Sequence, residues 1–216
     1  MLPNLNNYHI ATGQHPIPNQ PGITWLIALN GVFKCGCNAN QQIIIQTSSQ
    51  SIPIPGLVGI LPSVSWKGCH QRLPSAWLSL LLNDAQQAAR IEHGIARPIE
   101  KQYFITNQHT TIRLIPARQT STIHHIAYEM PSDPVLVDIH SHHGMPAYFS
   151  PTDNADDTGL SVSCVIGNIF KNPEIICRLN VYGHHQVVPI TTIFDGNGPF
   201  IDIAQREEKA YADVDF

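Results

Sequence analysis

Hydrophobic and polar positions alternate through much of the first seventy residues, which is the period of half-buried β-strands. Two such runs, at residues 24–29 and 32–35, flank Asn30-Gly31. Asn-Gly is a strong hairpin signal because both residues tolerate positive φ. A further strand is predicted over residues 42–46, whereas residues 1–22 are rich in Asn, Gln and Pro and indicate an irregular lead. The front of the chain is therefore predicted to be β-rich.

The hydrophobic period changes from two to nearly four at Pro74-Ser75. Ser75 can cap a helix that reaches about Arg90, and the apolar positions of its predicted buried face are Trp77, Leu80, Leu81, Ala85 and Ala88. Strand-like runs follow at residues 99–106, 111–116, 122–128, 135–140, 160–169, 174–182 and 186–194, with Gly183-His184-His185 separating the last two. One helix followed by many strands predicts the α+β class.

These patterns suggest a division of the chain into three parts. Residues 1–72 form the β-rich N-terminal region with its irregular lead, residues 73–204 the helix-and-strand core, and residues 205–216 a C-terminal tail. Residues 205–210 are polar and charged and could form a short helix, whereas the last four residues suit a frayed end.

The composition of the chain argues against nucleic-acid binding, membrane insertion and a disulfide framework. The net charge is −4, charged residues make up 13% of the 216 residues, and no cluster of basic residues is present. A nucleic-acid footprint is therefore not supported. No apolar run approaches the roughly 20 residues of a membrane span, and the amino terminus lacks a signal peptide, so a cytoplasmic location without membrane contact is expected. Five cysteines, an odd number, favour free thiols.

The strongest chemical signal lies at the end of the run over residues 135–140. His140 and His142 are two apart, so on a strand both imidazoles point the same way and can share one metal ion. A catalytic zinc ion takes three protein ligands and leaves a fourth position for water. Asp153 is the natural third ligand.

Ser150 and Asp153 also have a purely structural interpretation. Ser150-Pro151-Thr152-Asp153 is typical of a helix start, with Ser150 as the N-cap and proline in the first helical position. Capping does not compete with ligation, because a capped first turn would aim Asp153 back toward the strand end. The sequence therefore favours a metal site formed by His140, His142 and Asp153.

The order His140-Ser141-His142, seven residues, then Ser150-x-x-Asp153 resembles the signature of the JAB/MPN-type (JAMM) zinc metalloproteases. The resemblance covers roughly residues 74–194. It implies a JAB/MPN core, which is a cytidine-deaminase-like mixed sheet with flanking helices, and a bound Zn²⁺ ion. The preceding β-rich region lies outside the resemblance.

The same resemblance implies further site residues. Family members carry an upstream glutamate as general acid/base, and Glu100 is the best match. Ser150 would donate a hydrogen bond to the developing oxyanion. Asp138 could orient a ligand histidine or face the same cavity. Two positions depart from the family pattern: residues 101–103 lack the usual glycine, and His143 replaces the usual proline.

The resemblance implies a zinc-dependent hydrolase of peptide or isopeptide bonds, acting at the C-terminus of a ubiquitin-like protein or on a peptide. The β-rich front half and the His-Ser-His-His variant are similar to the bacterial members encoded in the PRTRC cassette, beside ThiF-like (ubiquitin-activating) and ParB-like proteins. A ThiF-like activating protein is then an expected partner. Two alternatives stay open: a catalytically silent MPN-like scaffold that binds protein partners, and a metal hydrolase of small molecules.

Overall fold

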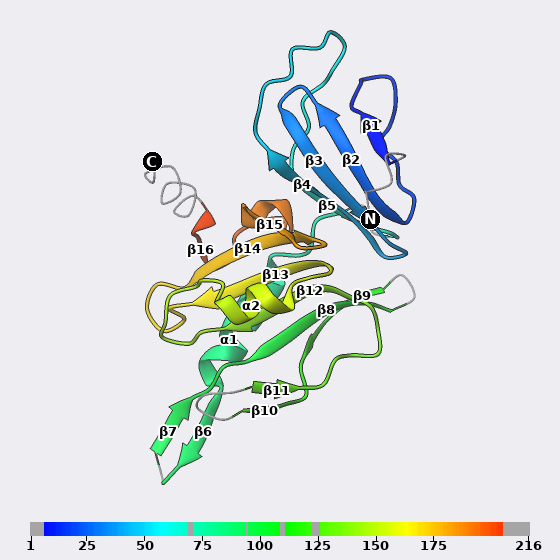
Figure 1. Ribbon diagram of the computed structural model, residues 1–216. Coiled ribbons are helices and arrows are strands. Elements are labelled where there is room, and N and C mark those ends of the chain that lie inside the picture. The colour runs from blue at the N-terminus through cyan, green and yellow to red at the C-terminus, as the bar shows by residue number, and fades with distance from the viewer. Residues whose placement is uncertain (1–6, 69–70, 94, 109–110, 122–125, 205–216) are drawn as a thin grey trace.

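The structure is a computed structural model that describes residues 7–68, 71–93, 95–108, 111–121 and 126–204. These residues form two larger sheets, two small hairpins and two α-helices, a sheet-rich arrangement that agrees with the α+β prediction (Figure 1). No helix within the described ranges is both long and apolar enough to cross a membrane.

The first sheet is made by the N-terminal region. Its strands are β1 (Tyr8–Ile10), β2 (Gly22–Ala28), β3 (Gly31–Cys37), β4 (Gln41–Ser48) and β5 (Ser63–Trp66), in that order across the sheet. The predicted hairpin forms, but its turn lies one residue earlier than Asn30-Gly31, because Ala28 pairs with Gly31 and leaves Leu29 and Asn30 as the loop. The Asn30 side chain is instead used to hold the backbone of Ile60, at 2.8 and 3.0 Å.

The second sheet has the order β15-β14-β13-β12-β8-β9, with β16 paired to β14. Its strands are β8 (Gln102–Gln108), β9 (Thr111–Pro116), β12 (Val135–Ser141), β13 (Leu160–Gly167), β14 (Glu174–Val181), β15 (His184–Val188) and β16 (Ile201–Asp202). The sheet is mixed, since β12 runs parallel to β13 and antiparallel to β8. The connection from β12 to β13 contains helix α2 (Pro151–Asp156).

The two helices cover opposite faces of this sheet (Figure 1). Helix α1 (Ala76–Gln87) packs Leu78, Leu81, Leu82 and Ala85 into the main core. The predicted face was wrong in part, because Leu80 is 60% exposed, and Ser75 makes no side-chain capping bond. The helix also ends three residues before Arg90, since the chain turns into a hairpin that the sequence did not predict.

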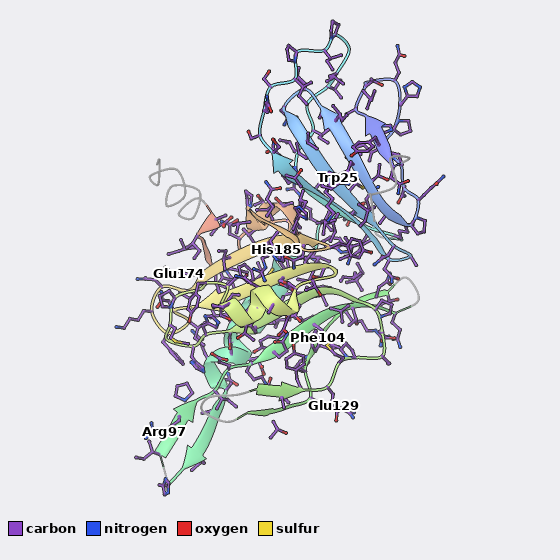
Figure 2. The ribbon with its side chains drawn as sticks, in the orientation of Figure 1. Trp25, Arg97, Phe104, Glu129, Glu174 and His185 are labelled. Atoms are coloured by element: carbon purple, nitrogen blue, oxygen red, sulfur yellow. The ribbon has the colours of Figure 1, made fainter. Side chains whose placement is uncertain are left out.

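That hairpin consists of β6 (Ala89–Glu92) and β7 (Ile95–Pro98) and projects from the body of the molecule (Figures 1 and 2, with Arg97 labelled). A second hairpin, β10 (Gln119–Ser121) with β11 (Ile126–Tyr128), lies beside β8, where Tyr128 contacts Phe104 with ring centroids 5.7 Å apart. Two predicted strands need correction: β8 begins at Gln102 rather than at residue 99, and β15 begins at His184 rather than after His185. The predicted helix over residues 205–210 lies outside the described residues.

The two larger sheets share one hydrophobic core. Ile43 and Ile45 of β4 belong to the same buried cluster as Leu179 and Val181 of β14. Gly36 permits this approach, because a Cβ there would lie 2.4 Å from Leu160 Cδ1. The predicted domain boundary near residue 72 falls between β5 and α1, so it separates two sheets that are packed together.

Buried polar contacts also cross between the sheets. Lys34, 5% exposed, donates to the Tyr182 carbonyl oxygen at 2.8 Å and lies 3.1 Å from His184 Nδ1. The Gln41 amide donates to the carbonyl oxygen of Leu160 at 3.0 Å. Buried polar groups such as these are costly unless they are bonded, so the contacts fix how the sheets are placed.

Candidate metal centre

The centre begins at the end of β12, a strand whose alternate residues face opposite sides of the sheet. Val137 and Ile139 point into the core beneath α1, whereas His140 points to the face that carries α2. His142 lies just past the strand, and its backbone N–H continues the ladder by donating to the Ile166 carbonyl oxygen at 2.8 Å. Both imidazoles therefore point to the same side, as the spacing predicted.

Asp153 approaches from the other side of the centre, in the first turn of α2. Ser150 is the N-cap: its hydroxyl oxygen accepts from the Asp153 N–H at 3.2 Å, and its own N–H donates to Asp153 Oδ2 at 2.6 Å. This reciprocal capping box leaves the second carboxylate oxygen, Oδ1, facing His140 Nε2 at 3.8 Å. Helix capping and metal ligation are thus compatible in Asp153, because each uses a different carboxylate oxygen.

The three donor atoms lie close enough together to bind one metal ion with little rearrangement. His140 Nε2 and His142 Nε2 are 3.1 Å apart, and the donor atoms of all three residues lie within 4.8 Å of one another. Ligands held about 2.0–2.2 Å from a tetrahedral ion are separated by about 3.3–3.6 Å. Two imidazoles and one carboxylate, with a fourth direction left for water, are a donor set that suits Zn²⁺.

The ring of His142 is held in an orientation that suits ligation. Its Nδ1 lies 3.2 Å from the Pro146 carbonyl oxygen, which can only accept, so Nδ1 carries the hydrogen and Nε2 carries the lone pair. Tyr148 packs edge-on against the same ring, with centroids 4.7 Å apart. A carbonyl that fixes the tautomer in this way is a common feature of metal-bound histidines.

The protonation state of His140 favours ligation as well. Burial lowers the pKa of His140 well below its usual range, although the nearby Asp153 carboxylate opposes this effect. His140 is therefore a neutral imidazole at pH 7, and protons do not compete with a metal ion for its lone pair.

Glu100 stands in the segment directly before β8, and not within the strand that was predicted over residues 99–106. The segment is fastened to β12 between the two histidines: Lys101 N–H donates to Ser141 Oγ, and Ser141 N–H donates to the Lys101 carbonyl oxygen, both at 2.9 Å. Burial raises the pKa of Glu100, an imidazolium at His142 would lower it, and the charge of Asp153 raises it. Because Lys101 is bonded to Ser141 through both its N–H and its carbonyl oxygen, the segment that carries Glu100 lies against the strand end between the two histidines.

Asp138 also faces this side of the sheet, two residues before His140. Its Oδ1 accepts from the Gln102 amide at 2.5 Å. Burial raises the pKa of Asp138 to about 7, although the Gln102 hydrogen bond opposes the shift. Among the described contacts none joins Asp138 to a ring nitrogen of His140, and the carboxylate is bonded to Gln102 instead.

Sequence reasoning missed two residues that support the centre. Gly167 lies at the end of β13 directly beneath the loop that leads from His142 to Ser150, and Arg178 on β14 contacts helix α2. Both carried a usable signal: a glycine inside a strand pattern often marks a close backbone approach, and an arginine amid apolar strand positions requires a buried partner.

Gly167→Ala is expected to weaken metal binding by displacing the loop. A Cβ at this position would lie 2.2 Å from Ala147 N and 2.4 Å from Pro146 C, which are backbone atoms that cannot rotate away. The Pro146 carbonyl that orients His142 would move, so we expect a loss of about 10–100-fold in zinc affinity and about 1–3 kcal/mol in stability. Gly144→Ala in the same loop is the control, because a Cβ there meets no atom within 4 Å. Equal zinc affinity of both variants would contradict the expectation.

Comparison with known proteins agrees with this geometry. Residues 76–180 match the family described as prokaryotic homologs of the JAB domain, a range that contains both histidines, Ser150, Asp153 and Glu100. None of the curated proteins compared with the chain matches it. The order of the candidate ligands, the mixed sheet that carries them and the family match lead to one conclusion: residues 76–180 of this chain are a JAB domain of the prokaryotic family.

Proposed function

We propose that this JAB domain is a zinc-dependent hydrolase of peptide or isopeptide bonds. The observation that carries the proposal is the convergence of His140, His142 and Asp153 within 4.8 Å, beside the half-buried carboxyl of Glu100. A pure scaffold has no need for three converging ligands and an adjacent acid. The substrate we infer is the C-terminus of a ubiquitin-like protein or another peptide, with a ThiF-like activating protein as a further partner.

The chemistry divides between the ion and the residues of the chain. A zinc ion bound by the three ligands would lower the pKa of its water toward about 7 and polarise the scissile carbonyl. Glu100 accepts a proton from the attacking water and passes it to the leaving amine, a task for which a pKa raised by burial is suited.

Ser150 has a hydrogen available for the oxyanion. In the capping box the Ser150 hydroxyl oxygen accepts a bond from Asp153 N–H, which does not use the hydroxyl hydrogen. That hydrogen can donate to the negative charge that develops on the substrate carbonyl. Capping and catalysis are therefore compatible in Ser150, as ligation and capping are in Asp153.

A groove of about 380 Å³ beside the β10–β11 hairpin offers a place for an extended chain. Gln119 and Tyr128 are among the residues that line it. The Gln119 amide also donates to the Glu100 carbonyl oxygen at 2.7 Å and accepts from Gln102 N–H at 2.9 Å, so the groove is joined to the segment that carries the proposed acid/base.

Zinc analysis combined with a hydrolysis assay tests the proposal. We expect one zinc ion per chain, and at zinc concentrations about 100 times the Kd a stabilisation of about 2.7 kcal/mol over metal-free protein. Ubiquitin-like proteins fused through their C-termini to a reporter are expected to be cleaved by the zinc form, to be spared after chelation, and to be cleaved again when zinc is restored. His140→Ala should show neither stabilisation nor cleavage. Protein that binds no zinc would refute the proposal.

One observation favours a second candidate, the catalytically silent scaffold. Where the family commonly has a glycine after its glutamate, this chain has larger residues, and Tyr103 is buried in the core with its hydroxyl donating to Asp84 at 2.9 Å. Zinc binding without cleavage of any ubiquitin-like fusion or peptide, together with a partner complex that survives His140→Ala, would establish the scaffold instead.

A further inference from the structure

Helix α2 carries Asp153 but has little of its own to hold it in place. It spans six residues, Pro151–Asp156, and none of its residues is buried. Helices this short are unstable in isolation and depend on tertiary contacts. The capping box fixes the first turn relative to Ser150, but it does not fix the helix relative to the sheet that carries the histidines.

Arg178 supplies contacts between this helix and the sheet. It lies on β14, 3% exposed, on the same face as α2. Its Nη2 donates to the carbonyl oxygen of Asp153 at 2.9 Å, and its Nη1 donates to Asn154 Oδ1. The guanidinium thus binds the backbone of the ligand residue itself and the side chain of the next residue.

The same guanidinium also binds the chain on both sides of this turn. Its Nε and Nη2 donate to Asp157 Oδ2, at 3.2 and 2.7 Å, directly after the helix. The central carbon atom of the guanidinium, Cζ, lies 3.9 Å from the ring centroid of Phe149, the residue directly before Ser150. A planar group with five donors can hold several acceptors at fixed angles, which a lysine ammonium cannot do.

Asp157 is held from the sheet side as well. Ser163 of β13 donates its hydroxyl to Asp157 Oδ2 at 2.7 Å, and the Asn180 amide of β14 donates to Ser163 Oγ at 2.9 Å. His185 of β15, labelled in Figure 2, lies with Nδ1 2.9 Å from Asn180 Oδ1. This chain of hydrogen bonds crosses three strands and leaves the pair formed by Arg178 and Asp157 little freedom to move.

We propose that Arg178 is a positioning residue for the metal centre: it holds Asp153 at ligand distance from His140 by fastening residues 149–157 to β14. The inference rests on the metal site of the proposed function but not on hydrolysis. A ligand displaced by a fraction of an ångström binds its ion less well, so the position of α2 sets the affinity for zinc.

Arg178→Lys tests this inference, because lysine keeps the charge but cannot bind Asp153, Asn154 and Asp157 together. We expect zinc affinity, measured by competition with a chromophoric chelator, to fall by about 10–100-fold. Hydrogen exchange of the backbone amides of residues 152–157 in the zinc-free protein is expected to become faster. Lys34→Met is the matched control: it removes another buried cation, at the contact between the sheets, and should leave both measurements within about twofold of the unaltered chain.

Three results would overturn the inference. They are unchanged zinc affinity in folded Arg178→Lys, unchanged exchange in the helix, and an equal loss of affinity in Lys34→Met, which would mean that general destabilisation is the cause. Should Arg178→Lys fail to fold, Asp157→Asn replaces it, since it keeps the side-chain shape and removes the charge that holds the guanidinium. If the unaltered chain binds zinc without hydrolysis, only the proposed function fails; if it binds no zinc, the exchange measurement decides the inference.

Discussion

Glu100→Gln is expected to lower the rate of hydrolysis by about 10²–10⁴-fold, the usual contribution of a general acid/base. Glutamine has the same shape but cannot accept the proton of the attacking water. Zinc binding should remain, because Glu100 is not one of the three converging ligands. The measurement is kcat for cleavage of a ubiquitin-like fusion, together with the zinc content of the same sample.

Asp133→Asn is the control for this substitution. Asp133 lies just before β12, at the end of the strand opposite to the one that carries the histidines. The substitution also turns a carboxylate into an amide but lies away from the zinc site, so kcat should stay within about threefold. If Glu100→Gln cleaves as fast as the unaltered chain, Glu100 is not the acid/base, and the departure from the family pattern at residues 101–103 gains weight.

Local signals in the sequence were sufficient for the helix start at Ser150 and the strand that ends in the histidines. Both depend on neighbouring residues: the capping box is closed within residues 150–153, and the period of two places His140 and His142 on one face whatever surrounds them. The face of α1 was harder to predict. This helix has leucines on more than one face, and packing against β4, β12 and β14 decides which face is buried. Leu78 and Leu82 are buried, whereas Leu80 is not.

Contacts between distant segments could not be predicted from spacing. The guanidinium of Arg178 meets Asp157 only because β14 pairs with β13 and α2 folds over both strands. Lys34 lies in the first sheet, and its acceptor, the carbonyl oxygen of Tyr182, follows a strand of the second sheet, 148 residues away along the chain. Such partners are settled by topology, which a single sequence specifies only indirectly. The convergence of the three candidate ligands was therefore predictable from local pattern, whereas the residues that hold them in place were not.

Asp153→Asn is expected to remove zinc binding while keeping helix α2 intact. The amide oxygen of asparagine can still accept the N–H of Ser150, so the cap is retained and the stability of the zinc-free protein should change by less than about 1 kcal/mol. The anionic ligand oxygen that faces His140 is lost, however. Loss of an outer partner of a ligand costs about 10–100-fold in metal affinity, and loss of the ligand itself should exceed about 100-fold. Chelator competition and zinc-dependent thermal unfolding measure the two effects separately.

Asp156→Asn is the control that distinguishes the loss of a ligand atom from the loss of a negative charge on helix α2. Asp156 lies on the same six-residue helix and is exposed, so the substitution removes one negative charge near the centre without removing a converging donor atom. Because exposed charges are screened by solvent, zinc affinity should change by no more than about twofold. If Asp153→Asn binds zinc as tightly as Asp156→Asn does, the carboxylate of Asp153 serves only as a helix cap and the three-ligand centre is wrong. If only Asp153→Asn loses zinc, the oxygen that the cap leaves unused is the third ligand.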